Sequence, residues 1–342
     1  MASLLLADLH LDDKPRNEYR WGLFPWLIEQ VAEHNITTIY IIGDITDVKD
    51  RHNAKFTNRL VSALLELGQH CQVVMTMGNH DYIDPEQPFF GFLDGLPGLT
   101  YIHKPMIHED PELGELLMLP HSRTPEADFG DIDLSEFAAV FAHQSVIGAV
   151  ASEFYEISHG LSHRFFDQSK KTWAGDIHCP QECGKLEYVG SPYHVHFGDL
   201  FEPRVVVLDG DATQIAKTLT FESPQRVTLR VSNVEDLNNY GLKAGDHVKV
   251  QLHLDRTEVH RWSVLRKRVR ELCTKNEWTF FGCQLEVEQT ELSQKVDEAG
   301  KPVAAPKKAV ASPEETLLRF AEQQSLGGDL LDRGKALMQG VA

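Results

Sequence analysis

Residues 72–81 read Gln-Val-Val-Met-Thr-Met-Gly-Asn-His-Asp, an apolar segment that ends in three polar side chains directly after a glycine. A short apolar run of this kind is typical of a buried strand, and glycine allows a tight turn out of it. In α/β sheets, sites usually lie at the carboxyl ends of the strands. We therefore expect Asn79, His80 and Asp81 to belong to a functional site.

Four further polar motifs follow apolar segments in the same way. They are Asp8-Leu9-His10, Gly43-Asp44-Ile45-Thr46-Asp47, Ala142-His143-Gln144 and Gly175-Asp176-Ile177-His178. Residues two apart in an extended segment point the same way, so the first and last motifs can each present two side chains to one ion. Their oxygen and imidazole donors suit Mn²⁺, Fe²⁺, Zn²⁺ or Mg²⁺.

Each motif alone has a plainer interpretation. Aspartate and histidine two apart are common, Gly-Asp after a strand is often only a turn, and His143 could be a satisfied core histidine. The ordered set of five motifs is much rarer than any member. It predicts a centre for two metal ions in which the carboxylate of Asp44 bridges both.

The first 210 residues alternate short apolar runs with helical stretches, which predicts a layered α/β fold. We expect strands at 3–7, 38–42, 72–77, 138–142 and 205–208, and helices at 21–34 and 55–67. Beyond residue 210, strands at 226–231, 247–254 and 278–289 with a helix at 259–275 predict a small α+β domain. The expected domains are 1–212, 213–292, a flexible linker at 293–312, and C-terminal helices at 313–342.

Composition sets limits on the function. Of 342 residues, 42% are hydrophobic and 25% charged, as in ordinary globular proteins. The sequence shows no apolar run of about 18 residues and no signal-peptide pattern, and its five cysteines are scattered, so we expect a cytoplasmic protein without a membrane segment, in a bacterial cell or a phage-infected host. Residues 1–216 hold 14 Lys and Arg against 33 Asp and Glu, a net charge of −19, which argues against a nucleic-acid substrate unless bound metal ions offset it.

The five motifs together resemble those of the calcineurin-like metallophosphoesterase superfamily. Within it, the sequence is most similar to the nuclease subunit of SbcCD-type DNA-repair complexes, through residues 175–181, Tyr188-Val189-Gly190-Ser191-Pro192 and Phe197-Gly198. The resemblance implies a four-layer sandwich of β-sheets flanked by helices, with a small capping domain and C-terminal helices. It covers residues 1–210 by motif and the remainder by domain order.

The resemblance also implies residue roles. One metal would be held by Asp8, His10, Asp44 and His178, and the second by Asp44, Asn79, His143 and Asp176. His80 would face the scissile phosphate as transition-state stabiliser or general acid, with Asp81 orienting it, and Asp47 would support the ligands. The family usually has histidine where this chain has Asp176, and a carboxylate there favours Mn²⁺ or Mg²⁺.

Candidate DNA contacts are His52, beside the Asp44 loop, and the basic run of Arg261, Arg266, Lys267, Arg268 and Arg270. A solvated surface explains each of them equally simply. His194 and His196 are interpreted as a strand edge lining the cleft. In the C-terminal helices, the apolar residues Leu317, Leu318, Phe320, Leu330 and Leu331 either pack back on the chain or bind a partner, which the resemblance implies is a coiled-coil ATPase subunit.

Three functions compete. The first is a Mn²⁺-dependent (or Mg²⁺-dependent) DNA exonuclease and endonuclease that works in repair or recombination as the homodimeric partner of an ATPase. The second is a stand-alone phosphodiesterase acting on a small nucleotide or a phosphoprotein. The third is a scaffold with a degenerate metal site, which rests on Asp176 alone. The additional domain, linker and terminal helices favour the first.

Overall fold

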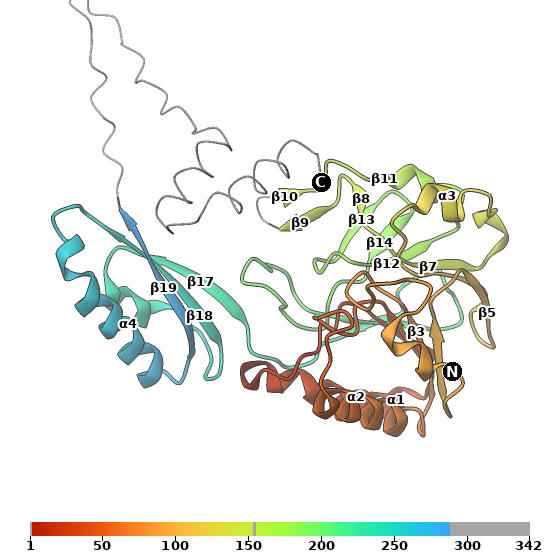
Figure 1. Ribbon diagram of the computed structural model, residues 1–342, viewed down its shortest axis with the longest axis horizontal. Helices are drawn as coiled ribbons and strands as arrows, with labels where there is room; N and C mark the ends of the chain where they lie inside the picture. Colours follow the sequence, from red (N-terminus) through yellow and green to blue (C-terminus); the bar gives the residue numbers. More distant parts are fainter. Residues whose placement is uncertain (1, 153–154, 288–342) are drawn as a thin grey trace, which may run out of the picture. The chain divides into compact units, whose positions relative to one another are not determined.

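The computed structural model describes residues 2–152 and 155–287, which form one compact unit. Two six-stranded mixed sheets make up most of it (Figure 1). The first has the order β16 (Lys217–Leu219), β15 (Val205–Leu208), β1 (Ala2–Leu6), β2 (Ile36–Ile42), β3 (Gln72–Thr76) and β4 (Leu99–Ile102). The second has the order β13 (Gln181–Cys183), β14 (Leu186–Tyr188), β12 (Thr172–Gly175), β7 (Ala139–His143), β6 (Gly114–Leu119) and β5 (Met106–Asp110).

Alternation along the strands assigns side chains to different layers. In β1, Leu4 and Leu6 belong to the apolar cluster beneath α1 (Leu23–His34) and α2 (Ala54–Leu67), whereas Leu5 belongs to the cluster between the sheets, with Phe141 and Trp173. Successive strand residues point to opposite faces, so one apolar strand contributes to both layers. The helices α1 and α2 lie side by side (Figure 1).

The outer face of the second sheet is covered by shorter elements than the sequence suggests. Its apolar cluster includes Phe129 and Leu134, from the five-residue helix α3 (Pro125–Phe129) and a 3-10 turn at Leu134–Glu136. Short strands complete this region: β8 (Val146–Ile147) pairs with β11 (Leu161–Ser162), and β9 (Val150–Ser152) pairs with β10 (Tyr155–Glu156). The predicted α/β sandwich is confirmed, with few helices in this layer.

The small domain begins later than predicted. Strand β16 pairs with β15 in the first sheet and Phe221 packs against that sheet's core, so the expected boundary at residue 212 is wrong and falls inside the sheet. Beyond it, β17 (Arg226–Val231), β18 (His247–Leu254) and β19 (Thr279–Val287) form a parallel sheet covered by α4 (Trp262–Lys275). The expected elements of the α+β domain are thus present.

The predicted linker at 293–312 and the helices at 313–342 lie outside the described residues, together with Leu317, Leu318, Phe320, Leu330 and Leu331. Within the described part of the chain, no helix combines the length and apolar character needed to cross a bilayer.

Candidate metal centre

The five motifs meet because their strands are neighbours. Strands β1, β2 and β3 run parallel in the first sheet, and β7 and β12 run parallel in the second. Parallel strands present their carboxyl ends at one edge of a sheet. The two sheets face each other across a shared apolar layer, so the polar side chains that follow these five strands converge.

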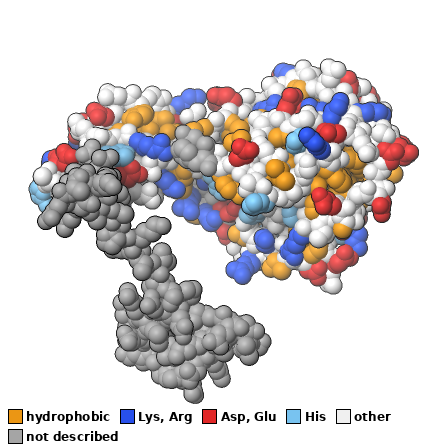
Figure 2. Space-filling model, turned by 90° about the horizontal axis from the view of Figure 1, so that it is seen from above, with side chains coloured by type: hydrophobic (Ala, Val, Ile, Leu, Met, Phe, Trp, Pro, Cys, Tyr) orange, Lys and Arg blue, Asp and Glu red, His pale blue; other side chains and the backbone are white. Residues whose placement is uncertain are grey.

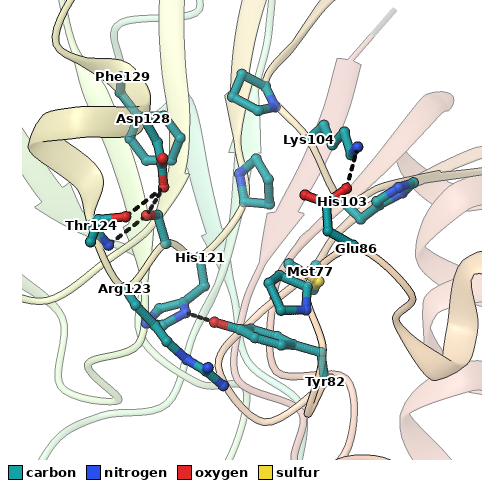
Figure 3. A pocket seen from close by; sticks show the side chains of 14 residues that line it. Met77, Tyr82, Glu86, His103, Lys104, His121, Arg123, Thr124, Asp128 and Phe129 are labelled. Carbon is teal, nitrogen blue, oxygen red and sulfur yellow. Dashed lines mark hydrogen bonds and ion pairs between the residues drawn. The ribbon is translucent and has the colours of Figure 1, made fainter.

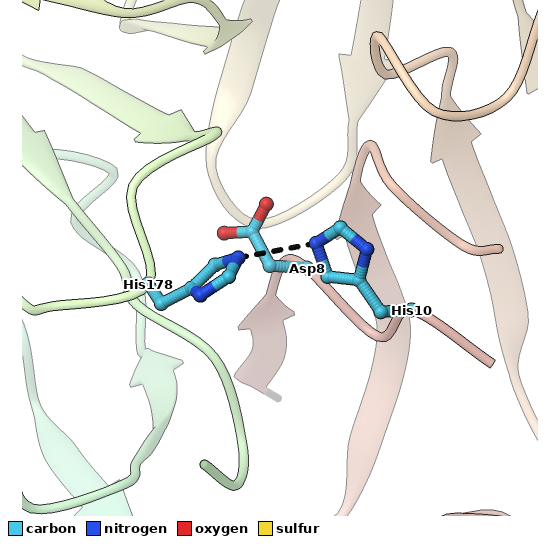
Figure 4. A group of neighbouring side chains, drawn as sticks. All are labelled: Asp8, His10 and His178. Carbon is cyan, nitrogen blue, oxygen red and sulfur yellow. Dashed lines mark hydrogen bonds between the residues drawn. The ribbon is translucent and has the colours of Figure 1, made fainter. Parts of the chain in front are cut away.

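Three groups of side chains have donor atoms within 4.8 Å of one another and could hold a metal ion. They are Asp8, His10 and His178; Asp8, Asp44 and His143; and His10, Asp44 and His80. In the first group, the Nε2 atoms of His10 and His178 lie 3.1 Å apart beside the Asp8 carboxylate (Figure 4). These two nitrogens form a hydrogen bond, and together with the carboxylate they could coordinate one cation.

The shared carboxylate expected of Asp44 agrees with the geometry. Its Oδ2 lies 3.4 Å from His10 Nε2, and its Oδ1 lies 3.4 Å from His143 Nε2. The Oδ1 atom also accepts a hydrogen bond of 2.8 Å from the His80 backbone. Asp44 therefore lies between the two ligand groups.

Several buried oxygen and nitrogen atoms that could bind a metal have no hydrogen-bond partner among the described residues. These atoms are Asp8 Oδ2, Asn79 Oδ1 and His143 Nε2. Buried polar atoms without partners are costly in a folded protein, and here all three lie where metal ligands are expected. The residues present fit divalent cations.

The charges of the centre support the same fit. Burial raises the pKa of Asp8 to about 6, and burial with the nearby negative charge of Asp44 raises the pKa of Asp81 to about 7. Burial likewise raises the pKa of Asp176. These carboxyl groups crowd negative charge into a buried volume, which bound cations would offset.

Backbone conformation at the strand ends is unusual. Positive φ angles occur at Asp8 (58°), His10 (42°), Asp44 (52°) and Asp176 (90°). Such angles are uncommon for residues other than glycine, and they cluster at functional sites, where the surrounding structure maintains them. All four residues are predicted ligands.

Glycines make the close approach possible. A Cβ added to Gly43 would lie 2.1 Å from His143 Nδ1, and one added to Gly78 would lie 2.2 Å from the Asp44 backbone nitrogen. A Cβ on Gly175 would lie 2.7 Å from the same His143 atom. No larger residue fits at these positions without moving a predicted ligand.

Neighbouring groups fix the histidine rings. His143 Nδ1 lies 2.8 Å from the Ile42 carbonyl oxygen, which leaves Nε2 for an ion. Asp47 Oδ1 lies 3.6 Å from His10 Nδ1, in the supporting position expected for it. Carboxylates and carbonyls behind metal-binding histidines set the orientation and basicity of the ring.

Asp199 supports His178 and was missed by sequence reasoning. Its Oδ2 lies 3.5 Å from His178 Nδ1 and accepts 2.7 Å hydrogen bonds from the backbone of Val195 and His196. Burial alone would lower the pKa of His178, but the Asp199 carboxylate raises this pKa above its ordinary value. The signal available in the sequence was only its place directly after Phe197-Gly198.

Asp176 occupies the rim of the centre. Its Oδ1 lies 3.9 Å from His143 Nε2, and its side chain is 14% exposed, whereas that of His143 is fully buried. Asp176 is in none of the three groups of close donor atoms among the described residues. Asp176 is thus less closely grouped with the other carboxylates and histidines than Asp8 or Asp44.

The expected role of Asp81 needs correction. Its carboxylate accepts hydrogen bonds from the backbone of Gly78 (2.8 Å), Thr46 (3.1 Å) and Ile45 (3.3 Å). The ring of His80 instead has its Nδ1 3.3 Å from the Asp47 carbonyl oxygen. Asp81 thus joins the two loops that carry Asp44 and His80, and does not orient the His80 ring directly.

His52, a predicted DNA contact, packs against three phenylalanines. Its ring stacks on Phe56 at 5.0 Å and lies against Phe89 and Phe90, both at 4.9 Å. Both ring nitrogens are buried. The half-buried side chain thus belongs to an aromatic cluster.

The basic residues of α4 are exposed but largely paired. Arg268 contacts Glu235 at 2.9 Å, Arg261 contacts Glu258 at 2.7 Å, and Lys267 contacts Glu271 at 3.9 Å. Arg270 lies over the Phe280 ring, and Arg266 is exposed. Over the face shown in Figure 2, Lys and Arg side chains are interspersed with Asp and Glu.

The two histidines of residues 194–196 separate in the structure. The ring of His196 lies 4.9 Å from that of His178, beside the metal centre. The ring of His194 turns away, with Nε2 2.8 Å from the Phe201 carbonyl oxygen and Nδ1 accepting from the Arg226 backbone. Residues 193–196 form no strand, so the strand-edge interpretation is wrong, and only His196 lies beside the centre.

Comparisons with known proteins agree with this site. The family described as calcineurin-like phosphoesterase matches residues 1–173, and the chain belongs to it. This confirms the resemblance to the superfamily, whose members are metal-dependent hydrolases of phosphate esters.

A curated relative is exonuclease subunit 1 of Enterobacteria phage T4, 28% identical over 230 residues. The match covers 60% of this chain and 63% of the relative. Two solved structures are similar in part. A nuclease from Pseudomonas putida has 14% identity and a TM-score of 0.33, covering 64% of this chain and 87% of that one. A dimetal phosphatase from Danio rerio has 11% identity and a TM-score of 0.38, covering 65% and 99%.

Proposed function

We propose that this protein is a two-metal phosphodiesterase that cleaves DNA as exonuclease and endonuclease. The observation that carries the proposal is that Asp8 and His143, each with a buried atom that has no hydrogen-bond partner, lie together with Asp44 in one group of close ligand atoms. The similarity to an exonuclease subunit supports DNA as the substrate.

The expected ligand sets are Asp8, His10, Asp44 and His178 for one ion and Asp44, Asn79, His143 and Asp176 for the other. Ions held there supply Lewis-acid activation of the phosphoryl group and of an attacking water. Mn²⁺ is the preferred ion and Mg²⁺ the alternative, because carboxylate and amide oxygens outnumber imidazoles in the second set.

His80 completes the chemistry from outside the ligand sets. Its backbone N–H is fixed on Asp44 and its Nδ1 on the Asp47 carbonyl oxygen. When Nδ1 donates its hydrogen bond to this carbonyl oxygen, Nε2 is free to carry the proton that the departing oxygen of the substrate accepts. A positioned acid of this kind contributes roughly 10²–10⁴-fold.

The deciding experiment offers the purified full chain Mn²⁺ together with linear double-stranded DNA, single-stranded DNA or bis-p-nitrophenyl phosphate. We expect all three to be cleaved and EDTA to abolish cleavage. Asp44→Asn, which alters the shared ligand, is the negative control. Cleavage of the small ester alone would instead identify a stand-alone phosphodiesterase of small substrates, and no cleavage by metal-loaded protein would identify a scaffold.

The remaining parts of the proposal concern assembly. We propose a homodimer that binds a coiled-coil ATPase subunit through residues 313–342 and acts in DNA repair or recombination in the cytoplasm. The phage relative is itself an exonuclease subunit, which supports a partner for this chain. Leu317→Asp with Leu318→Asp should abolish capture of the cognate ATPase while leaving cleavage by the isolated chain intact, and light scattering would give the oligomeric state.

A further inference from the structure

A pocket of about 440 Å³ lies beside the metal centre and is lined by none of the proposed metal ligands (Figure 3). Its walls come from three loops: residues 77–86 after β3, 103–105 after β4, and 120–129, which lead from β6 into α3. Its volume is within the roughly 300–1,000 Å³ typical of small-molecule sites. Of these loops, the one after β3 also carries Asn79 and His80 of the centre.

Direct contacts join the pocket to the centre. Tyr82 lies two residues after His80, and its hydroxyl is 2.9 Å from His121 Nδ1. The His121 ring lies 6.3 Å from the ring of His143. The pocket is therefore separated from the metal centre only by the His121 ring on this side.

Arg123 gives the pocket its positive charge. The guanidinium donates to the Ile83 carbonyl oxygen at 3.1 Å and lies 5.1 Å from the centre of the Tyr82 ring. Within residues 2–152 and 155–287, no ion pair joins it to a carboxylate. The other lining cation, Lys104, is paired with Glu86 at 2.7 Å.

The acidic group of the pocket is occupied by neighbouring hydroxyls. Asp128 accepts hydrogen bonds from Ser122 Oγ and, at 3.1 Å, from Thr124 Oγ1. Figure 3 shows this cluster on the same side as Arg123 and above it, with Tyr82 below. The pocket thus has a cationic end beside Tyr82, while apolar wall is provided by Pro85, Pro105 and Pro120.

We propose that this pocket binds the nucleotide unit adjoining the scissile phosphate, with Arg123 contacting that unit's own phosphate. The inference rests on the proposed nuclease function and specifies how its site recognises nucleic acid. Guanidinium groups suit phosphate because their donors form paired, charge-assisted hydrogen bonds. Residues 1–216 have a net charge of −19, so a positively charged side chain without a carboxylate partner is unusual there. The position of Arg123 beside the centre suits the negatively charged phosphate next to the one that reacts.

The test compares two substrates in Arg123→Gln, which removes the charge and keeps a polar side chain. Oligothymidylate has an adjoining phosphate, whereas bis-p-nitrophenyl phosphate has none. We expect KM for the oligonucleotide to rise about tenfold or more, as loss of a charge-assisted hydrogen bond implies, and the kinetics on the aryl ester to stay unchanged. Arg123→Lys should recover part of the loss, and Arg164→Gln, an exposed arginine outside the pocket, should behave as wild type.

A binding measurement separates this inference from the proposed function. Thymidine 5′-monophosphate is titrated into metal-free wild-type protein and Arg123→Gln by calorimetry. Weaker binding of thymidine 5′-monophosphate by the variant supports the pocket. If the wild type cleaves only the aryl ester, the nuclease proposal fails, but weaker binding by the variant would still support the pocket. Equal binding, or equal loss of activity on both substrates, overturns the pocket.

Discussion

His80 differs from the other histidines of the centre in what holds it. Its ring lies edge-on to that of His10, with 4.8 Å between the ring centroids, and its Nδ1 faces a backbone carbonyl. The distances alone would also allow it to join His10 and Asp44 around an ion. The proposed role as acid, outside the ligand sets, therefore needs a test that reads metal content and turnover separately.

We expect His80→Ala to lower turnover by about 10²–10⁴-fold while the bound metal, measured by plasma mass spectrometry, stays near the wild-type content. The change removes a proton donor and leaves both proposed ligand sets intact. His34→Ala, at the end of α1, is the control for loss of a histidine elsewhere. Loss of metal from the His80 variant would show that His80 is a ligand.

Asp199 acts on the centre through another residue. Its carboxylate faces His178 Nδ1 and accepts two backbone hydrogen bonds from its own loop. Asp199→Asn keeps an oxygen acceptor for the loop but removes the negative charge behind the ring. We expect metal affinity to fall about 10–100-fold in a metal titration followed by calorimetry, with little change in the melting temperature of the metal-free protein.

Unchanged affinity in the Asp199 variant would mean that the carboxylate only shapes residues 195–199. A parallel Asp211→Asn variant, at an exposed turn, controls for the loss of one negative charge from the acidic half of the chain.

Among the secondary-structure elements, the turn between β5 and β6 is tied to the first sheet by one buried carboxylate. Asp110 accepts hydrogen bonds from the Tyr40 hydroxyl at 2.5 Å and from the backbone of Glu112 and Leu113 at 2.8 and 2.9 Å. Burial opposes ionisation, but these hydrogen bonds lower the pKa of Asp110 below its ordinary 3.8. The ionised form joins β5 at the edge of the second sheet to β2 of the first.

The sign of the resulting pH dependence follows from the lowered pKa. A carboxyl group with a lower pKa in the folded state stabilises the protein above its unfolded pKa and loses that contribution as pH falls below about 3.8. We expect Asp110→Asn to reduce the free energy of unfolding at pH 7 by about 1–3 kcal/mol and to weaken its decline in acid. Urea unfolding at pH 7 and at pH 3 measures both, and parallel pH profiles for variant and wild type would contradict the assignment.

At the scale of the whole molecule, Arg226 joins the small domain to the phosphoesterase domain. From the start of β17 its guanidinium donates 2.6 Å hydrogen bonds to Asn17 Oδ1 and to the Val195 carbonyl oxygen. Its backbone N–H donates to His194. Arg226 therefore contacts the start of the loop that contains Asp199, at His194 and Val195.

We expect Arg226→Met to destabilise the protein by about 1.5–3 kcal/mol, because buried partners of a charged donor lose their hydrogen bonds, and also to weaken metal binding through residues 195–199. Thermal unfolding and metal titration give the two values. Lys267→Met, on the exposed face of α4, is the matched control. Lower stability with unchanged metal affinity would show that the junction is independent of the centre.

Much of this protein follows from local sequence patterns. Apolar runs and glycines predicted the strands and the motifs at their ends, because burial and backbone freedom act within a few residues. The ligand candidates followed from donor chemistry and two-residue spacing. The order of strands in each sheet could not be predicted from such patterns, because it depends on contacts between segments far apart in the chain.

The sequence by itself determined the family, the alternation of strands and helices, and the set of side chains able to bind metal. Only the tertiary structure decided which of them meet, that Asp199 stands behind His178, that the His52 ring packs against phenylalanines and that Asp176 lies at the rim. The reason is physical: a donor's identity is local, but its orientation, burial and partners come from elements that are distant in sequence and adjacent only after folding.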